Sequence, residues 1–361
     1  MEEELLEENR SDIDNIESIE SNNPEQETDV VDEKKARKKK IKRIIKILFL
    51  VVVAVFLVRY FYKNKEDFAK IDLSRINIRV FLIAVLIHFV YKTMQASLWH
   101  YITYLNGCSI KWWDAVVAYL ISILGKYIPG KVFMLLARIP AYEEEGKSVA
   151  KVSVSFLIEN ICTLLGAAFL FIISLFFIPS NVFNEMSAQY EKYKWAVLIV
   201  IVLFFICIHP AIINFFLDIL QKLTKKDNLK IPMTYPQMLK VVVLFILNWM
   251  VLGVGYYLVV YALYPIGLEY MLYVGGVFGL AVMAGILALF APSGGGVREA
   301  VMIALLIPII PEDNAAEYAV VISLVARLWM TVSEFSVIGL GYFADIIKKK
   351  IKKIKVKKVT E

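Results

Sequence analysis

The chain has 361 residues, of which 59% are hydrophobic and 20% are charged, and its mean hydropathy is +0.63. Several apolar runs are long enough to cross a bilayer core of about 30 Å, which excludes a soluble globular protein and predicts a polytopic membrane protein. The three cysteines lie in or beside apolar segments, so they predict neither a disulfide framework nor a metal cluster.

Charge divides the N-terminal segment into two parts. Residues 1–33 carry fourteen acidic residues and one basic residue, whereas residues 34–46 carry nine basic residues and no acidic residue. The acidic part has few apolar residues, so we expect residues 1–43 to form a disordered tail that is first acidic and then polybasic. Residues 346–361 should form a second polybasic tail. Lysines beside a membrane ordinarily meet anionic lipid head groups, so we expect no nucleic-acid partner.

Eight apolar runs follow in chain order, at residues 44–62, 80–104, 113–138, 150–178, 195–218, 239–263, 270–310 and 319–344. Two of them are interrupted, one at Pro129 and Gly130 and the other at residues 292–296. Proline ends a helix and glycine permits the chain to reverse, whereas the remaining runs read as continuous helices. We therefore predict an all-α membrane bundle of six full spans and two re-entrant broken hairpins.

The distribution of lysine predicts how this bundle is oriented. The loop at residues 221–240 carries five lysines and one acidic residue, and both termini are polybasic. Cytoplasmic loops are enriched in basic residues, so we expect this loop and both termini to be cytoplasmic in a multi-pass protein of the cell membrane. The loop at residues 63–79 would then be external, although its five basic residues outnumber its three acidic residues.

The two interruptions resemble each other. ILGKYIPG at residues 123–130 and ILALFAPSG at residues 286–294 share the spacing of Ile-Leu, an aromatic residue, proline and glycine, and a basic residue follows each. We interpret the membrane domain, residues 44–345, as an internal repeat with half A at 80–178 and half B at 239–344. The predicted orientation makes the halves inverted. Broken segments at matching places in inverted halves indicate a transporter site near the bilayer midplane, where we expect the two breaks to meet.

The second break predicts a binding site for phosphate. Broken backbone at membrane depth must be buried in protein or line a wet cavity, because lipid cannot satisfy the freed polar groups. The outgoing half-helix should begin near Val297, which places Arg298 at the positive end of its dipole. The break itself contains Pro292, Gly294, Gly295 and Gly296.

Ionisable residues also occur inside the predicted spans, at Lys92, Glu159, Arg327 and Glu334. His88, Lys92, Gln95 and Trp99 share one helical face. An intramembrane lysine without a partner costs at least about 2.5 kcal/mol, so this face should contact protein or water. Such charges either line a substrate path or form structural ion pairs, for example between Lys92 and Glu159, and both interpretations stay open.

Two motifs carry a resemblance to a known family. GKYIPGKVFMLLAR with a later glutamate-containing helix, and PSGGGVREAVMIALL with an arginine-containing last helix, resemble the transmembrane region of the lysylphosphatidylglycerol synthase family. That family includes flippase-like membrane proteins, and the resemblance covers roughly residues 45–345. The second motif is similar to the family pattern P-G-G-x-G-V-R-E, with Ser293 in place of one glycine. Asn160 follows Glu159 where the family often has arginine.

The resemblance implies a membrane domain that moves a phosphate-bearing lipid between leaflets, with anionic head groups as its partners. The lipid would be a phospholipid, an aminoacyl-phospholipid or a polyprenyl phosphate. Lys131, Arg138, Arg298 and Arg327 would hold the phosphate. Glu159, Glu299 and Glu334 would balance these residues or contact a cationic head group.

Full synthases of this family also have a soluble domain that aminoacylates phosphatidylglycerol, and we expect none here. The chain should therefore be no enzyme and should need no cofactor or metal. The alternative is the membrane subunit of a lysylphosphatidylglycerol synthase or glycosyltransferase system whose transferase is encoded separately. A small-solute or ion transporter is a third interpretation, and a homo-oligomer stays open.

The orientation can be tested with single cysteines in a variant that lacks the three native ones. Lys226→Cys in the lysine-rich loop should resist a membrane-impermeant thiol reagent applied to intact cells, whereas Lys70→Cys in the predicted external loop should react. Efficient external labelling at position 226 would overturn the inverted topology.

Overall fold

The computed structural model describes residues 62, 76–127, 132–178, 199, 206, 208–224, 229–288, 296–310 and 314–360. The chain divides into two compact units, Met1–Lys65 and Glu66–Glu361. Only Tyr62 is described in the first unit, so the predicted N-terminal tail and nearly all of the first predicted span lie outside the described residues.

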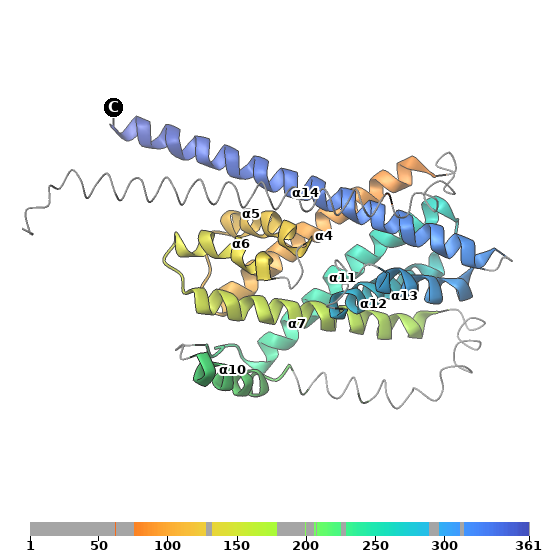
Figure 1. Cartoon of the computed structure of the whole chain (residues 1–361), viewed down its shortest axis with the longest axis horizontal. Coiled ribbons are helices and arrows are strands. Elements are labelled where there is room, and N and C mark those ends of the chain that lie inside the picture. The colour runs from red at the N-terminus through yellow and green to blue at the C-terminus, as the bar shows by residue number, and fades with distance from the viewer. Residues whose placement is uncertain are drawn as a thin grey trace, which may run out of the picture. The chain divides into compact units, whose positions relative to one another are not determined.

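All regular structure in the described part of the chain is helical (Figure 1). In chain order the elements are α4 (Ile78–Leu105), α5 (Trp112–Ser122), η2 (Ile123–Tyr127), α6 (Val132–Glu143), α7 (Val149–Ser174), η3 (Leu175–Phe177), α10 (Pro210–Thr224), α11 (Tyr235–Leu263), η5 (Leu268–Tyr270), α12 (Met271–Leu287), α13 (Val297–Leu306), η7 (Ile307–Ile309) and α14 (Ala315–Thr360). Five described segments are long and apolar enough to cross a membrane: Ile78–Leu105, Val149–Phe177, Tyr235–Leu263, Leu268–Leu287 and Ala315–Lys348. The predicted all-α, multi-pass architecture is confirmed.

Polar residues define where the long helices begin. The Asn77 side chain accepts a hydrogen bond from the Val80 amide at 3.4 Å, and the Ser148 side chain accepts one from the Lys151 amide at 3.5 Å. At the start of α11, the Gln237 side chain accepts a hydrogen bond from the Thr234 amide at 2.8 Å. Such caps satisfy amides that have no partner inside the helix, so short polar residues fix the ends of otherwise apolar segments.

One predicted span is interrupted. We expected residues 195–218 to form a continuous helix, but residues 208 and 209 form a turn and α10 begins at Pro210. Proline lacks the amide that a helix interior requires, whereas it is well accommodated in a first turn. His209 caps the new helix, since its Nδ1 accepts a hydrogen bond from the Ala211 amide at 3.2 Å. The prediction of one continuous helix was therefore wrong at this position.

The two predicted halves contain four helical elements in the same order. These are α4, α5, α6 and α7 in half A, and α11, α12, α13 and α14 in half B. Their packing is reciprocal: α4 contacts α11, while α7 contacts α12 and α14 contacts α5. Within both halves the first element contacts the second, the second contacts the third and the third contacts the fourth. This reciprocal packing supports two related halves, but the division into halves and their inversion both stay predictions.

The second elements of the two halves differ in length. The helix α5 has 11 residues, whereas the apolar segment that contains α12 has 20 and is long enough to cross a membrane by itself. We had assigned both to re-entrant hairpins, so the count of six full spans also stays a prediction. The first predicted break, Pro129 and Gly130, and the second, residues 292–296, lie outside the described residues except for Gly296.

The last helix is longer than the predicted span. We ended that span near residue 344, but α14 continues through the lysine-rich segment to Thr360. Lys348 forms an ion pair with Asp114 of α5 at 2.7 Å. The polybasic C-terminal segment is therefore a helical continuation of α14.

Close packing of glycines joins α11 to α12. A Cβ atom added to Gly253 would lie 2.8 Å from the Gly275 Cα atom, and one added to Gly275 would lie 2.9 Å from the Gly253 Cα atom. Small residues allow helix backbones to approach this closely in membrane bundles. Because α12 leads toward the second break, this contact helps to position it.

This contact predicts that the same substitution has different effects on stability at two glycines. Gly253→Ala should lower the melting temperature in detergent, because over-packing costs about 1–3 kcal/mol. Gly339→Ala in α14 should leave it unchanged or raise it, because a Cβ atom there has no neighbour within 4 Å and alanine favours helix. Equal melting temperatures for both variants would contradict the close contact.

Candidate functional site

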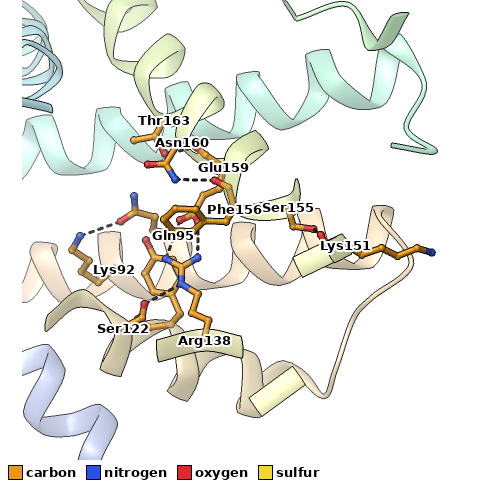
Figure 2. A network of polar contacts seen from close by, with 11 residues as sticks. Lys92, Gln95, Ser122, Arg138, Lys151, Ser155, Phe156, Glu159, Asn160 and Thr163 are labelled. Carbon is orange, nitrogen blue, oxygen red and sulfur yellow. Dashed lines mark hydrogen bonds and ion pairs between the residues drawn. The ribbon is translucent and has the colours of Figure 1, made fainter. Parts of the chain in front are cut away.

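A buried ion pair joins α6 to α7 in half A (Figure 2). Arg138 donates two hydrogen bonds to Glu159, from Nη1 to Oε2 at 2.5 Å and from Nη2 to Oε1 at 3.5 Å. Its Nε donates a third to Ser122 Oγ at 2.9 Å. The Arg138 side chain is 0% exposed. The structure thus pairs Glu159 with Arg138, rather than with Lys92 as the sequence suggested.

Aromatic rings enclose this ion pair. The Arg138 guanidinium lies over the Trp99 and Tyr119 rings, at 4.3 Å from each centroid, and 5.3 Å from that of Phe156. Cation–π contacts of this kind stabilise a desolvated guanidinium. Because all three nitrogens of Arg138 donate to protein groups, we interpret the Arg138–Glu159 pair as a structural contact that holds α6 against α7. Its predicted role in holding phosphate stays a prediction.

A second set of charges gathers around Glu334 on α14. Its Oε2 atom accepts a hydrogen bond from Tyr127 Oη at 2.9 Å and forms an ion pair with Lys126 Nζ. Its Oε1 atom lies 3.9 Å from Lys92 Nζ. Lys92 also donates to Gln95 Oε1 at 3.1 Å. The Glu334 carboxylate of half B thus contacts two lysines and a tyrosine of half A.

The predicted stripe on α4 faces the protein. His88, Lys92, Gln95 and Trp99 are all buried. His88 packs edge-on against Trp329 of α14, with ring centroids 5.4 Å apart. The expectation that this face contacts protein or water is therefore confirmed.

Another ion pair joins α13 to α14 in half B. Arg327 Nη1 donates to Glu299 Oε1 at 2.5 Å, while Glu299 Oε2 accepts a hydrogen bond from the Gly296 amide at 2.7 Å. Gly296 has φ of 87°, a conformation that glycine adopts without steric cost. The helix α13 begins at Val297, as predicted. Glu299 thus caps this half-helix and also pairs with a cation.

Arg298 differs from the other buried arginines because no carboxylate pairs with it among the described residues. Its side chain is buried, with Nη1 2.9 Å from the Met330 sulfur and the guanidinium 4.8 Å from the Phe278 ring centroid. Its Nε and Nη2 atoms have no hydrogen-bond partner in the described structure. A buried donor without a partner costs about 1–3 kcal/mol, and more when it is charged. These two donors are therefore candidates for contact with a ligand.

Further polar atoms without a hydrogen-bond partner lie on residues that interact electrostatically with Arg298, or on α14 within one turn of its contact Met330. Within the described structure they include both His88 ring nitrogens, Tyr256 Oη, Trp329 Nε1, Ser333 Oγ and Glu334 Oε1. Phe278 links several of them, because it stacks on Tyr256 at 4.3 Å and packs against Trp329 at 5.9 Å between centroids. Native structures contain few such atoms, so their concentration here indicates a place where a polar ligand or water binds.

We name the charged residues around these atoms the central charge cluster: Lys92, Lys126, Arg298, Glu299, Arg327 and Glu334. Arg298 interacts electrostatically with Arg327, Glu299 and Glu334, and Lys126 interacts with Glu334, Arg298 and Arg327. The cluster holds four cations and two carboxylates, so its formal charge is an excess of two positive charges. Within a membrane bundle such an excess attracts an anion.

The structure brings five predicted site residues into this cluster: Lys92, Arg298, Glu299, Arg327 and Glu334. It places two others, Arg138 and Glu159, in the ion pair between α6 and α7, which interacts electrostatically with Lys92 of the cluster. Gly296 caps α13. Lys131, Pro292, Gly294 and Gly295 lie outside the described residues.

Sequence reasoning missed Lys126 and Tyr127. Both lie in ILGKYIPG, immediately before the first break. We had assigned the basic residue after that break, because it matches Arg298 in the second half. A lysine inside an apolar run was itself a usable signal, since an intramembrane charge is a functional candidate by default.

The described residues contain no group of three or more His, Cys, Asp or Glu side chains placed to hold a metal ion. The Cys108 and Cys162 thiols are free and buried. Basic residues and aromatic rings dominate the candidate site, and this composition suits an oxyanion.

A comparison with protein-family models matches residues 43–333 to the family described as "Lysylphosphatidylglycerol synthase TM region". The chain belongs to this family. Neither the curated proteins nor the solved structures that were compared contain a match to it. Membership of the lysylphosphatidylglycerol synthase transmembrane family places the chain among multi-pass membrane proteins associated with lipid modification, and confirms the resemblance expected from PSGGGVRE.

A structural role of the Arg138–Glu159 pair can be distinguished from a role in ligand binding by the effect of its removal on stability. Glu159→Gln should lower the melting temperature strongly, because removing one partner of a buried ion pair costs about 3–5 kcal/mol. Lys348→Ala, which removes a more exposed ion pair, should cost no more than about 1 kcal/mol. A Glu159→Gln protein as stable as the wild type would contradict the structural role.

Proposed function

We propose that this member of the lysylphosphatidylglycerol synthase transmembrane family translocates a phosphate-bearing lipid between the two leaflets. The central charge cluster supports this proposal, because it combines a positive excess with a buried arginine that has two unpartnered donors. Arginine presents its donors in a planar fork that matches the oxygens of a phosphate. Arg298 also lies in the first turn of α13, where the helix dipole favours an anion.

The pairing of the acidic residues favours phosphate over a cationic group as the ligand. Glu159 is paired with Arg138, and Glu299 with Arg327. Glu334 receives Lys92 and Lys126. Each of the three predicted carboxylates therefore already has a basic partner. A cationic head group would have to displace one of these residues, whereas a phosphate adds contacts to Arg298.

The cluster is built from both halves of the membrane domain. Lys92 and Lys126 belong to half A, whereas Arg298, Arg327 and Glu334 belong to half B. A head group held between two halves is exposed to alternate sides when the halves rock against each other, as in other repeat-built transporters. Only the polar head group has to cross, because the acyl chains stay in the hydrocarbon of the bilayer.

In this proposal the chain carries out no chemistry on the lipid. Its partners are anionic membrane lipids. A separately encoded transferase that supplies or consumes the lipid would act beside the chain rather than through the central charge cluster. Translocation by the purified protein alone would distinguish this function from that of a transferase subunit that needs its catalytic partner.

Arg298 gives the sharpest test. Arg298→Ala should lower the translocation of a fluorescent anionic phospholipid in proteoliposomes at least about tenfold, because a hydrogen bond to a charged group is worth about 1.5–3 kcal/mol. Arg298→Lys should retain part of the rate, since the charge persists without the fork. Arg79→Ala, at an exposed position in the first turn of α4, is the matched control and should translocate at the wild-type rate.

Two results would contradict the proposal. A folded Arg298→Ala protein that translocates as fast as the wild type would show that Arg298 only supports packing. Wild-type protein that translocates no lipid unless a transferase is added would favour the membrane-subunit interpretation.

A further inference from the structure

The central charge cluster contains more positive charge than a single negative charge can neutralise. Arg327 is matched by Glu299, so this pair contributes no excess. Lys92 and Lys126 share one carboxylate, Glu334, which leaves one positive charge over. Arg298 contributes the second, because no carboxylate pairs with it among the described residues. The two excess charges belong to neighbouring groups, since Lys126 and Arg298 interact electrostatically.

The unpartnered donors of Arg298 have a particular geometry. Nη1 is directed to the Met330 sulfur, so Nε and Nη2 are the donors without a partner. These two nitrogens form one edge of the guanidinium, and that edge can donate parallel hydrogen bonds to two oxygens of one oxyanion. A phosphate that accepts both bonds would still have oxygens to present to the lysines around Glu334.

Phosphate esters differ in the negative charge they bring to the cluster and in the number of oxygens they can present to its donors. A phosphodiester, as in phosphatidylglycerol, has one negative charge and two non-bridging oxygens. A terminal phosphate monoester has three non-bridging oxygens and carries about −1.5 to −2 charge at neutral pH. With a diester bound, one positive charge in the cluster would still lack an anion, and uncompensated charge at membrane depth is costly.

From this match we infer that the central charge cluster selects lipids that end in a phosphate monoester, as phosphatidic acid or a polyprenyl phosphate does, over lipids whose phosphate is a diester. The inference rests on the proposed function and narrows its substrate class. Tyr256 supports it, because its buried hydroxyl interacts electrostatically with Arg298 and has no hydrogen-bond partner in the described structure. That hydroxyl is a suitable donor to a third phosphate oxygen.

The test compares two lipids with the same acyl chains on the full-length protein in neutral detergent. Dioleoyl phosphatidic acid and dioleoyl phosphatidylglycerol compete with a fluorescent phospholipid for the wild-type protein at pH 7. Phosphatidic acid should bind at least about tenfold more tightly, since one further charge contact of about 1.4 kcal/mol corresponds to that factor. Arg298→Ala should remove most of this preference, whereas Arg79→Ala should keep it.

The pH dependence of the preference provides an independent readout. The second proton of a phosphate monoester has a pKa of about 6, so near pH 5 phosphatidic acid carries one charge, as the diester does. The tenfold preference should then fall below about threefold. His88 interacts electrostatically with Lys92, Glu334, Lys126 and Arg298, so any change in its charge would act on both lipids. The ratio of the two lipid affinities at each pH therefore reports the effect of the lipid's own charge.

Each outcome has a distinct meaning. Equal affinities at pH 7 that both depend on Arg298 would overturn the monoester preference while leaving the proposed lipid site intact. If the binding of neither lipid depends on Arg298, the proposed function would be overturned as well. Glycerol 3-phosphate should not compete at the concentrations at which phosphatidic acid does. Equal competition by this soluble monoester would overturn the selection of a lipid.

Discussion

The cost of placing charge inside a membrane organises this molecule. A charged side chain at membrane depth must find an opposite charge, a hydrogen-bond partner or water, because hydrocarbon offers none of these. The described structure meets that requirement in two ways. Arg138 is saturated by Glu159, Ser122 and aromatic rings, whereas Arg298 keeps two nitrogens without a partner. The saturated arginine can hold helices together, and the unsaturated one can bind a ligand.

The ion pairs also divide into those within a half and those between halves. The third and fourth elements of each half are joined by an arginine–glutamate pair, with the charges exchanged: Arg138 on α6 with Glu159 on α7, and Glu299 on α13 with Arg327 on α14. Both contacts of Glu334 with lysines instead connect half B to half A. If the halves move as units, the pairs within each half persist. The ion pairs that must change are those between the halves, which include both contacts of Glu334 with lysines and the pair of Lys348 with Asp114.

Much of the fold could be predicted from the sequence, since length and hydropathy alone identify a membrane helix. The runs at 80–104, 150–178 and 239–263 became α4, α7 and α11 with ends shifted by only a few residues. Helical spacing correctly placed His88, Lys92 and Gln95 on a buried face. Pattern reasoning failed at Pro210, where apolar composition hid a helix start that the proline itself indicated. It also ended α14 too early, because lysines are poor in a span yet good in a helix.

The partners of the buried charges could not be predicted in the same way, and the reason is physical. Periodicity gives the face on which a side chain lies, but an ion pair between elements depends on the rotation and depth of both. The sequence suggested Lys92 as a partner for Glu159, but packing brings Arg138 to Glu159 and places Lys92 beside Glu334. The proposed function depends on that choice. Once Glu159 is taken by Arg138, Lys92 and Lys126 have only one carboxylate between them, and the positive excess arises next to Arg298.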